Sequence, residues 1–156
     1  MSAGPFIIFS ANSDVINIAD IIANTVKVAL VNYNAGNPID SSETGDTVWA
    51  NVSSEEIANG YGYTTGGTTL TTKVSNTITD GFSFSSDNAL WTASGGAIPS
   101  WRTAIMYISG TLWGKTNPLI GHFLGNSADT DIASTSDSSN LELFTPSSGW
   151  FTKTAP

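Results

Sequence analysis

Short stretches in which apolar and polar residues alternate recur along the chain. In TVKVALVNY (25–33) the apolar residues repeat with the period of a β-strand, and turn-forming residues follow at 34–38. In GFSFSS (81–86) the two phenylalanines share one face and the serines share the other. Three further stretches of strand type are TTLTTKV (68–74), PLIGHFLG (118–125) and NLELF (140–144). Glycine, asparagine, aspartate and proline separate these stretches, so we predict an all-β fold, an antiparallel β-sandwich or barrel.

The stretch 103–108, TAIMYI, is apolar on both faces, which predicts a strand buried inside the core. The residues before it contain Trp91, a Gly-Gly turn, Trp101 and Arg102, the only arginine of the chain. We interpret them as a structural corner that carries the chain from one sheet edge into the buried strand. Arg102 is expected to pair there with a carboxylate or with unpaired carbonyls. If that pair were buried, removing Arg102 would cost about 3–5 kcal/mol.

One short helix is predicted at 54–59. Ser53 would cap it, Glu56 would reach back to the amide of Ser53, and Gly60 would end it. Residues 12–24 are ambiguous between a helix and a short strand with a loop, whereas 127–139 is expected to be a surface loop. We find no repeat and no linker, so residues 1–156 are predicted to form one domain.

Charge and composition narrow the classes of function. The chain has 13 acidic and 5 basic residues, a formal net charge of −8, and its cations are scattered singly. A phosphate backbone requires clustered cations, so we expect no nucleic acid as a partner. The chain has no cysteine, and therefore no disulfide, thiolate nucleophile or cysteine metal site. Its apolar runs are too short to span a membrane, and its start does not resemble a signal peptide, so we expect a soluble protein without Sec-type export.

Candidate chemistry is sparse. His122 is the only histidine and has no carboxylate beside it in the sequence, so a structural role is favoured over catalysis. Asp129, Asp131 and Asp137 could hold a hard cation, but the pattern of a calcium loop is missing and a solvated loop is favoured. We therefore expect no enzyme activity, no metal and no cofactor. Aromatic residues that could stack on sugars, but that more often anchor a core, are Trp49, Tyr61, Tyr63, Trp91, Trp101, Trp113 and Trp150.

Four stretches together resemble a family of tailed-bacteriophage virion structural proteins. They are TVKVALVNY (25–33), GYGYTTGGTTLTTKVSN (60–76), the corner leading into Arg-x-Ala-x-x-Tyr at 102–107, and NPLIGHFLG (117–125). Their order and spacing also match, and the resemblance covers about residues 20 to 125. It implies a non-enzymatic late protein, made in the bacterial host cytoplasm and built into the virion.

Among the positions in a virion, a head decoration (cement) protein on the outer capsid surface is expected first, because the negative charge disfavours contact with packaged DNA. Its partner would be the lattice of the major capsid protein, and it would form a homo-oligomer, with a trimer as one candidate. The alternative is a tail or head-tail component, and a carbohydrate-binding module for host attachment is less favoured. The unmatched ends, 1–20 and 126–156, are the expected docking arms, unless their apolar residues close the domain's own core. Those residues are Phe6, Ile7, Ile8, Phe9, Trp150 and Phe151.

Overall fold

The computed structural model describes residues 3–32 and 38–154 and is mostly β, with antiparallel sheets. The described strands form no closed barrel, so of the two predicted forms, a sandwich or a barrel, the sandwich describes the fold. The largest sheet has five strands in the order β1-β10-β7-β2-β3. Their bounds are Ile7–Ile8, Leu119–Leu124, Thr103–Ile108, Val26–Val31 and Thr68–Thr69.

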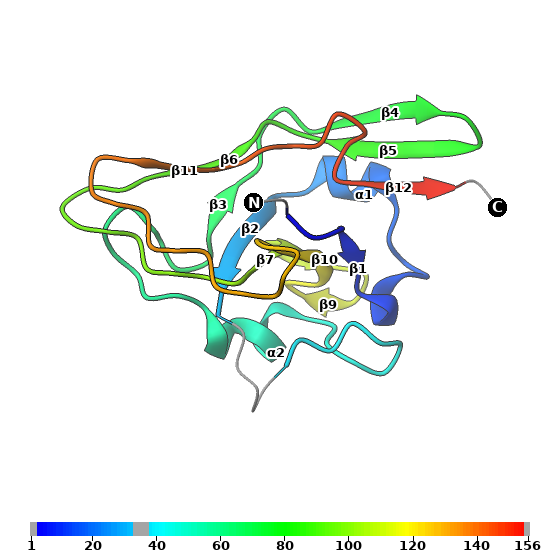
Figure 1. Cartoon of the computed structure of the whole chain (residues 1–156). Coiled ribbons are helices and arrows are strands. Elements are labelled where there is room, and N and C mark those ends of the chain that lie inside the picture. The colour runs from blue at the N-terminus through cyan, green and yellow to red at the C-terminus, as the bar shows by residue number, and fades with distance from the viewer. Residues whose placement is uncertain (1–2, 33–37, 155–156) are drawn as a thin grey trace.

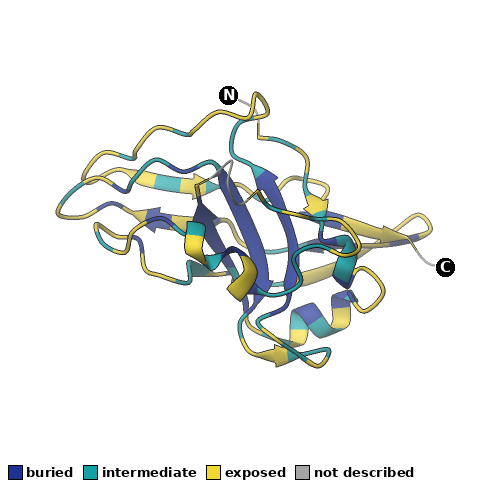
Figure 2. Cartoon of the chain, turned by 90° about the horizontal axis from the view of Figure 1, so that it is seen from below, coloured by how far each residue is buried: buried dark blue, intermediate teal, exposed yellow. Residues whose placement is uncertain are grey.

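The central strands of this sheet are buried on both faces (Figure 2). All six residues of β7 are buried, which confirms the strand predicted from its apolar character on both faces. Alternate residues enter two different cores: Met106 lies in the larger one, and its neighbours Ile105 and Tyr107 lie in the smaller one. A strand covered on both sides gains nothing from polar residues on either face, which explains its uninterrupted apolar sequence.

Two smaller sheets form a second layer over the five-stranded sheet (Figure 1). One has the order β12-β5-β4, with bounds Phe151–Thr154, Gly81–Ser85 and Val74–Ile78. The other pairs β11, Asn140–Leu143, with β6, Ala89–Thr92. A short hairpin of β8, Thr111–Leu112, and β9, Lys115–Thr116, connects β7 to β10. The larger core includes residues of both layers, such as Phe84 and Trp91 from one and Val28 from the other.

The ambiguous region 12–24 contains a helix, α1, at Ile18–Ala23. Its cap is Asn17, whose side chain accepts a hydrogen bond from the backbone N–H of Asp20 at 2.8 Å. Ile18 and Ile21 bury the inner side of the helix against the larger core. The cap and this apolar side decide between the two possibilities that the sequence left open.

The position predicted for the short helix, 54–59, is wrong. A single helical turn, α2, lies earlier, at Trp49–Val52, and continues as a 3-10 turn only to Glu55, while Glu56 is extended. The side chain of Asn51 accepts the backbone N–H groups of Thr47 and Val48, so the cap differs too. Gly60 lies in a turn that bridges to Tyr63 and ends no helix.

Two predicted strands also differ in detail. The stretch 68–74 is divided, because β3 ends at Thr69 in the lower layer and β4 begins at Val74 in the upper layer. In β5, Phe84 is buried but Phe82 is 47% exposed, although both side chains face the same way. Phe82 lies nearer the turn of the β4–β5 hairpin, where it lines an apolar pocket with Ile18 and Ile22 of α1, so α1 covers it only in part.

Candidate functional site

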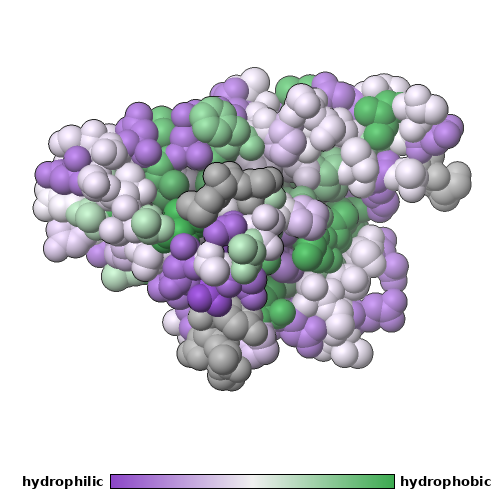
Figure 3. Space-filling view, in the orientation of Figure 1, coloured by the Kyte–Doolittle hydropathy of each residue, from purple (hydrophilic) through white to green (hydrophobic). Residues whose placement is uncertain are grey.

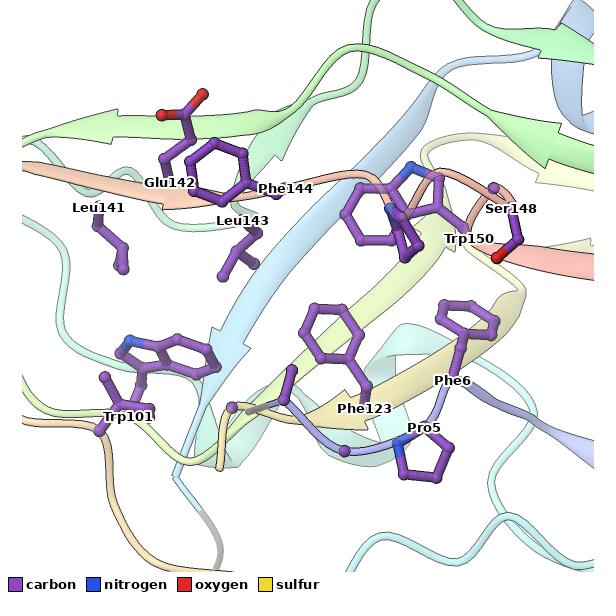
Figure 4. A pocket seen from close by; sticks show the side chains of 16 residues that line it. Pro5, Phe6, Trp101, Phe123, Leu141, Glu142, Leu143, Phe144, Ser148 and Trp150 are labelled. Atoms are coloured by element: carbon purple, nitrogen blue, oxygen red, sulfur yellow. The ribbon is translucent and has the colours of Figure 1, made fainter. Parts of the chain in front are cut away.

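An apolar groove of about 670 Å³ opens between the two layers. Figure 4 shows its walls: Trp101 and Phe123 lie on the side of the five-stranded sheet, and Leu141 and Leu143 of β11 lie opposite. Trp150 lies toward one end, and it stacks on Phe123 with ring centroids 5.9 Å apart. Aromatic rings locked in stacked pairs give the groove a stiff wall.

The rim of the groove combines one exposed ring with one charge. Phe144, directly after β11, is 71% exposed, the largest value among the exposed large apolar residues of the described ranges. Glu142 is the only charged residue among those described that line the groove, and it accepts a hydrogen bond from Asn88 Nδ2 at 2.8 Å. Figure 3 shows apolar patches between polar residues on this face of the molecule. This combination suits an apolar protein surface better than a small polar substrate.

The predicted corner lies beside this groove. Trp91 and Trp101 are both buried, one in each layer, and Gly95 and Gly96 have positive φ in the turn between them. The stretch therefore crosses from β6 of the upper layer to β7 of the lower. Only Trp101 also lines the groove.

Arg102 pairs with the acidic loop that follows β10. Its Nε donates to Asp131 Oδ1 at 2.7 Å, and its Nη1 lies 3.9 Å from Asp129 Oδ1. The arginine side chain is 23% exposed and both carboxylates are more than half exposed, so the pair lies at the surface. A loss of about 3–5 kcal/mol on removing Arg102 was expected only for a buried pair, and this pair is not buried. Across residues 3–32 and 38–154 no group of three or more histidine or acidic side chains is arranged to hold a metal ion.

His122 lies in β10 between Ile7 of β1 and Ile105 of β7, and it is buried. Its ring packs against Phe9 with centroids 5.1 Å apart, and neither ring nitrogen has a hydrogen-bond partner in the described part of the chain. Burial lowers the pKa of His122 to about 4, so the ring is neutral near pH 7. A general base needs a partner and access to substrate, and this histidine has neither among the described residues.

A polar clasp that the sequence did not reveal is centred on Glu56. Tyr63 Oη donates to Glu56 Oε1 at 2.7 Å and accepts the backbone N–H of Leu30 at 3.0 Å. Gly66 N–H donates to the same Oε1 at 2.6 Å, and Tyr107 Oη donates to the Gly66 carbonyl at 2.7 Å. Burial raises the pKa of Tyr107 to about 12 and that of Tyr63 still further, so both rings stay protonated donors. The clasp ties the Gly-Tyr-Thr-Thr-Gly-Gly segment to β2 and β7, a structural use of the motif.

Gly67 explains why that segment needs glycine. Its φ is +75°, and a Cβ added there would lie 1.9 Å from the carbonyl oxygen of Val28. The segment therefore passes against β2 with no room for a side chain. The Gly-Gly pair is the sequence signal for this close approach. The clasp was not predicted, because the spacing of Glu56 from Ser53 also fits a capping box.

Most of the predicted docking residues are not free to dock. β1 pairs with β10 and β12 pairs with β5, so both segments are strands of the two layers. Five of the six residues instead follow the alternative, in which they close the domain's own core. Phe9, Trp150 and Phe151 are buried, Phe6 and Ile8 are half-buried against the larger core, and Ile7 alone is exposed, at 42%.

The aromatic residues considered for sugar stacking are mostly covered as well. Those that are buried are Trp49, Tyr63, Trp91, Trp101 and Trp150. Trp113 is half-buried, with its indole N–H donating to Asp20 at 2.8 Å. Tyr61 is 54% exposed, but one edge of its ring lies against Gly96. A sugar ring would find one open aromatic face among these seven residues.

Comparison with known proteins gives no match: no protein-family model, no curated protein and no solved structure is similar to this chain. None of the helices among the described residues is long and apolar enough to cross a membrane.

Proposed function

We propose that this chain is a non-enzymatic structural protein of a tailed-phage virion, a decoration protein that binds the outer surface of the capsid. The resemblance over about residues 20 to 125 supports a place in a phage particle. The observation that carries the proposal is the open apolar groove of about 670 Å³ with Phe144 at its rim. A small-molecule active site would have convergent titratable groups, whereas this groove has apolar walls and a single carboxylate, as in a protein contact.

The charge of the chain supports a position on the outer surface. A net charge of −8 repels packaged DNA, which favours the outer side of the shell. Glu142 places one of these charges at the rim of the groove. The proposed occupant is therefore an apolar side chain of the major capsid protein that lies next to a lysine or arginine, with the cation facing Glu142. Many such contacts, repeated around a shell, stabilise the shell even when each is modest.

The test uses particles prepared without the protein, to which purified protein is added back. Bound protein should delay the release of DNA on heating. The Phe144→Ser variant should bind at least about tenfold more weakly, because it removes the exposed ring from the rim. The matched control is Val15→Ser, which removes an apolar side chain that is 38% exposed and does not line the groove.

Other outcomes would contradict parts of the proposal. Binding to tails alone would make the protein a tail or head-tail component. Binding to heads without a delay in DNA release would refute the cement role. Equal binding by both variants would refute the groove as the contact surface, even if the protein does bind heads.

A further inference from the structure

The strand β4 is an edge strand, and α1 packs against its inner face. All five of its residues are exposed, including Val74 at 42% and Ile78 at 37%. It pairs with β5 on one side, and no described strand lies on the other (Figure 1). Edge strands are usually protected by a lysine, a proline, a bulge or a covering loop, and VSNTI contains none of these residues. Its pairing with β5 runs from Val74 to Ile78 without a bulge.

The backbone of β4 is ready to accept another strand. In an antiparallel strand, alternate residues direct their N–H and C=O groups toward opposite neighbours, so half of these groups face away from β5. Exposed groups of this kind form hydrogen bonds with an added strand. The remaining question is which strand the side chains of β4 would suit.

The sequence of β4 is complementary to itself when it is read in the antiparallel direction. With Asn76 opposite its own counterpart, Val74 lies opposite Ile78 of a second copy, and Ser75 lies opposite Thr77. Apolar residues then meet apolar residues twice, and hydroxyl side chains meet twice. Matched cross-strand pairs of this kind stabilise a sheet.

The charges at the two ends of β4 are complementary as well. Lys73 precedes the strand and Asp80 follows it, so in this register Lys73 lies opposite Thr79 of the other copy, one residue from its Asp80. Lys73 is held near the edge, because its Nζ donates to the carbonyls of Asn24 and Ile21 at the end of α1. The two salt bridges in the described ranges both involve Arg102, which leaves Asp80 without a cationic partner there.

We propose that two copies of this chain pair antiparallel through β4, about a two-fold axis at Asn76. The three-stranded sheet of each copy then continues into a sheet of six strands across the pair. This pairing is isologous, so it gives a dimer and not the trimer considered from the sequence. It does not rest on the proposed function, because it concerns the purified chain alone.

The first test uses the absence of cysteine from the chain. Facing residues of an antiparallel pair have Cα atoms about 4.5–5.5 Å apart, a distance that a disulfide can span. Asn76→Cys should therefore form a disulfide-linked dimer rapidly under mild oxidation. Two controls should not: Val74→Cys on the same strand, and Thr152→Cys, which lies in the same row of the sheet as Asn76 but on the opposite edge strand, β12.

The second test measures association by sedimentation. Asn76→Lys places two like charges opposite each other and should weaken the dimer at least about tenfold, whereas Thr152→Lys should leave it unchanged. Mixing Asn76→Lys with Asn76→Glu should restore a dimer that contains one of each. A monomeric wild-type chain, equal cross-linking of the three cysteine variants, or failure of the mixture to associate would each overturn the proposal. Binding to capsids is measured separately, so loss of the dimer and loss of the proposed function can be told apart.

Discussion

Acid should destabilise this protein through one residue, His122. The ring is buried, packs on Phe9, and has no hydrogen-bond partner in the described part of the chain. Its pKa is about 4 in the folded chain, against 6.5 for an unperturbed histidine. The unfolded chain therefore binds the proton more tightly, and the free energy of unfolding falls as the pH falls from about 6.5 to about 4.

The size of this effect follows from the same two values. A difference of roughly 2.5 pH units at about 1.4 kcal/mol per unit gives about 3 kcal/mol, which is fully present above pH 6.5 and lost by pH 4. The perturbation is His122→Leu, an apolar side chain for an apolar site. The variant should lose this part of the pH dependence.

The assay is urea denaturation of both chains at a series of pH values from about 7.5 to about 4. Carboxylates also titrate on acidification, among them Asp40, whose pKa is lowered by hydrogen bonds from Ser42, and Asp87, whose pKa is lowered by Thr72 and Thr71, but their contribution is lost mainly below the range of this series. They contribute to both chains and cancel in the difference. Parallel stability curves for wild type and variant would refute the reasoning, because they would mean that His122 is protonated in the folded state without penalty.

Two further predictions concern stability and can be checked by the same denaturation measurement. Tyr63→Phe should lower the free energy of unfolding by about 2–4 kcal/mol, because it leaves the N–H of Leu30 and the carboxylate of Glu56 each short of a partner; a loss well under 1 kcal/mol would show that the clasp contributes little. Arg102→Ala should cost about 1 kcal/mol or less, because its pair with Asp131 is exposed, and the loss should shrink further in high salt; a loss as large as 3 kcal/mol would show that the pair behaves as a buried one.

The sequence by itself determined the class of the fold and its central strand. The apolar character of 103–108 on both faces is a local property, and the structure buries all six of those residues as β7. Period-2 alternation likewise located β2, β5 and β10 within a residue or two. The cap of α1 is also local, because Asn17 bonds to the N–H of Asp20 three residues later. The sequence alone nevertheless left helix and strand open there. These features depend on neighbouring residues, which is why they can be read along the chain.

Only the tertiary structure decided what each apolar or polar side chain meets. Glu56 had the spacing of a capping box, but Tyr63 and Gly66 take its carboxylate, so the predicted helix does not form. Phe82 and Phe84 follow one pattern, yet only Phe84 is fully covered, because the place where a neighbouring layer ends is not a property of either residue. The groove is lined by residues from 3 to 150, and their separation in the sequence does not predict that they lie together.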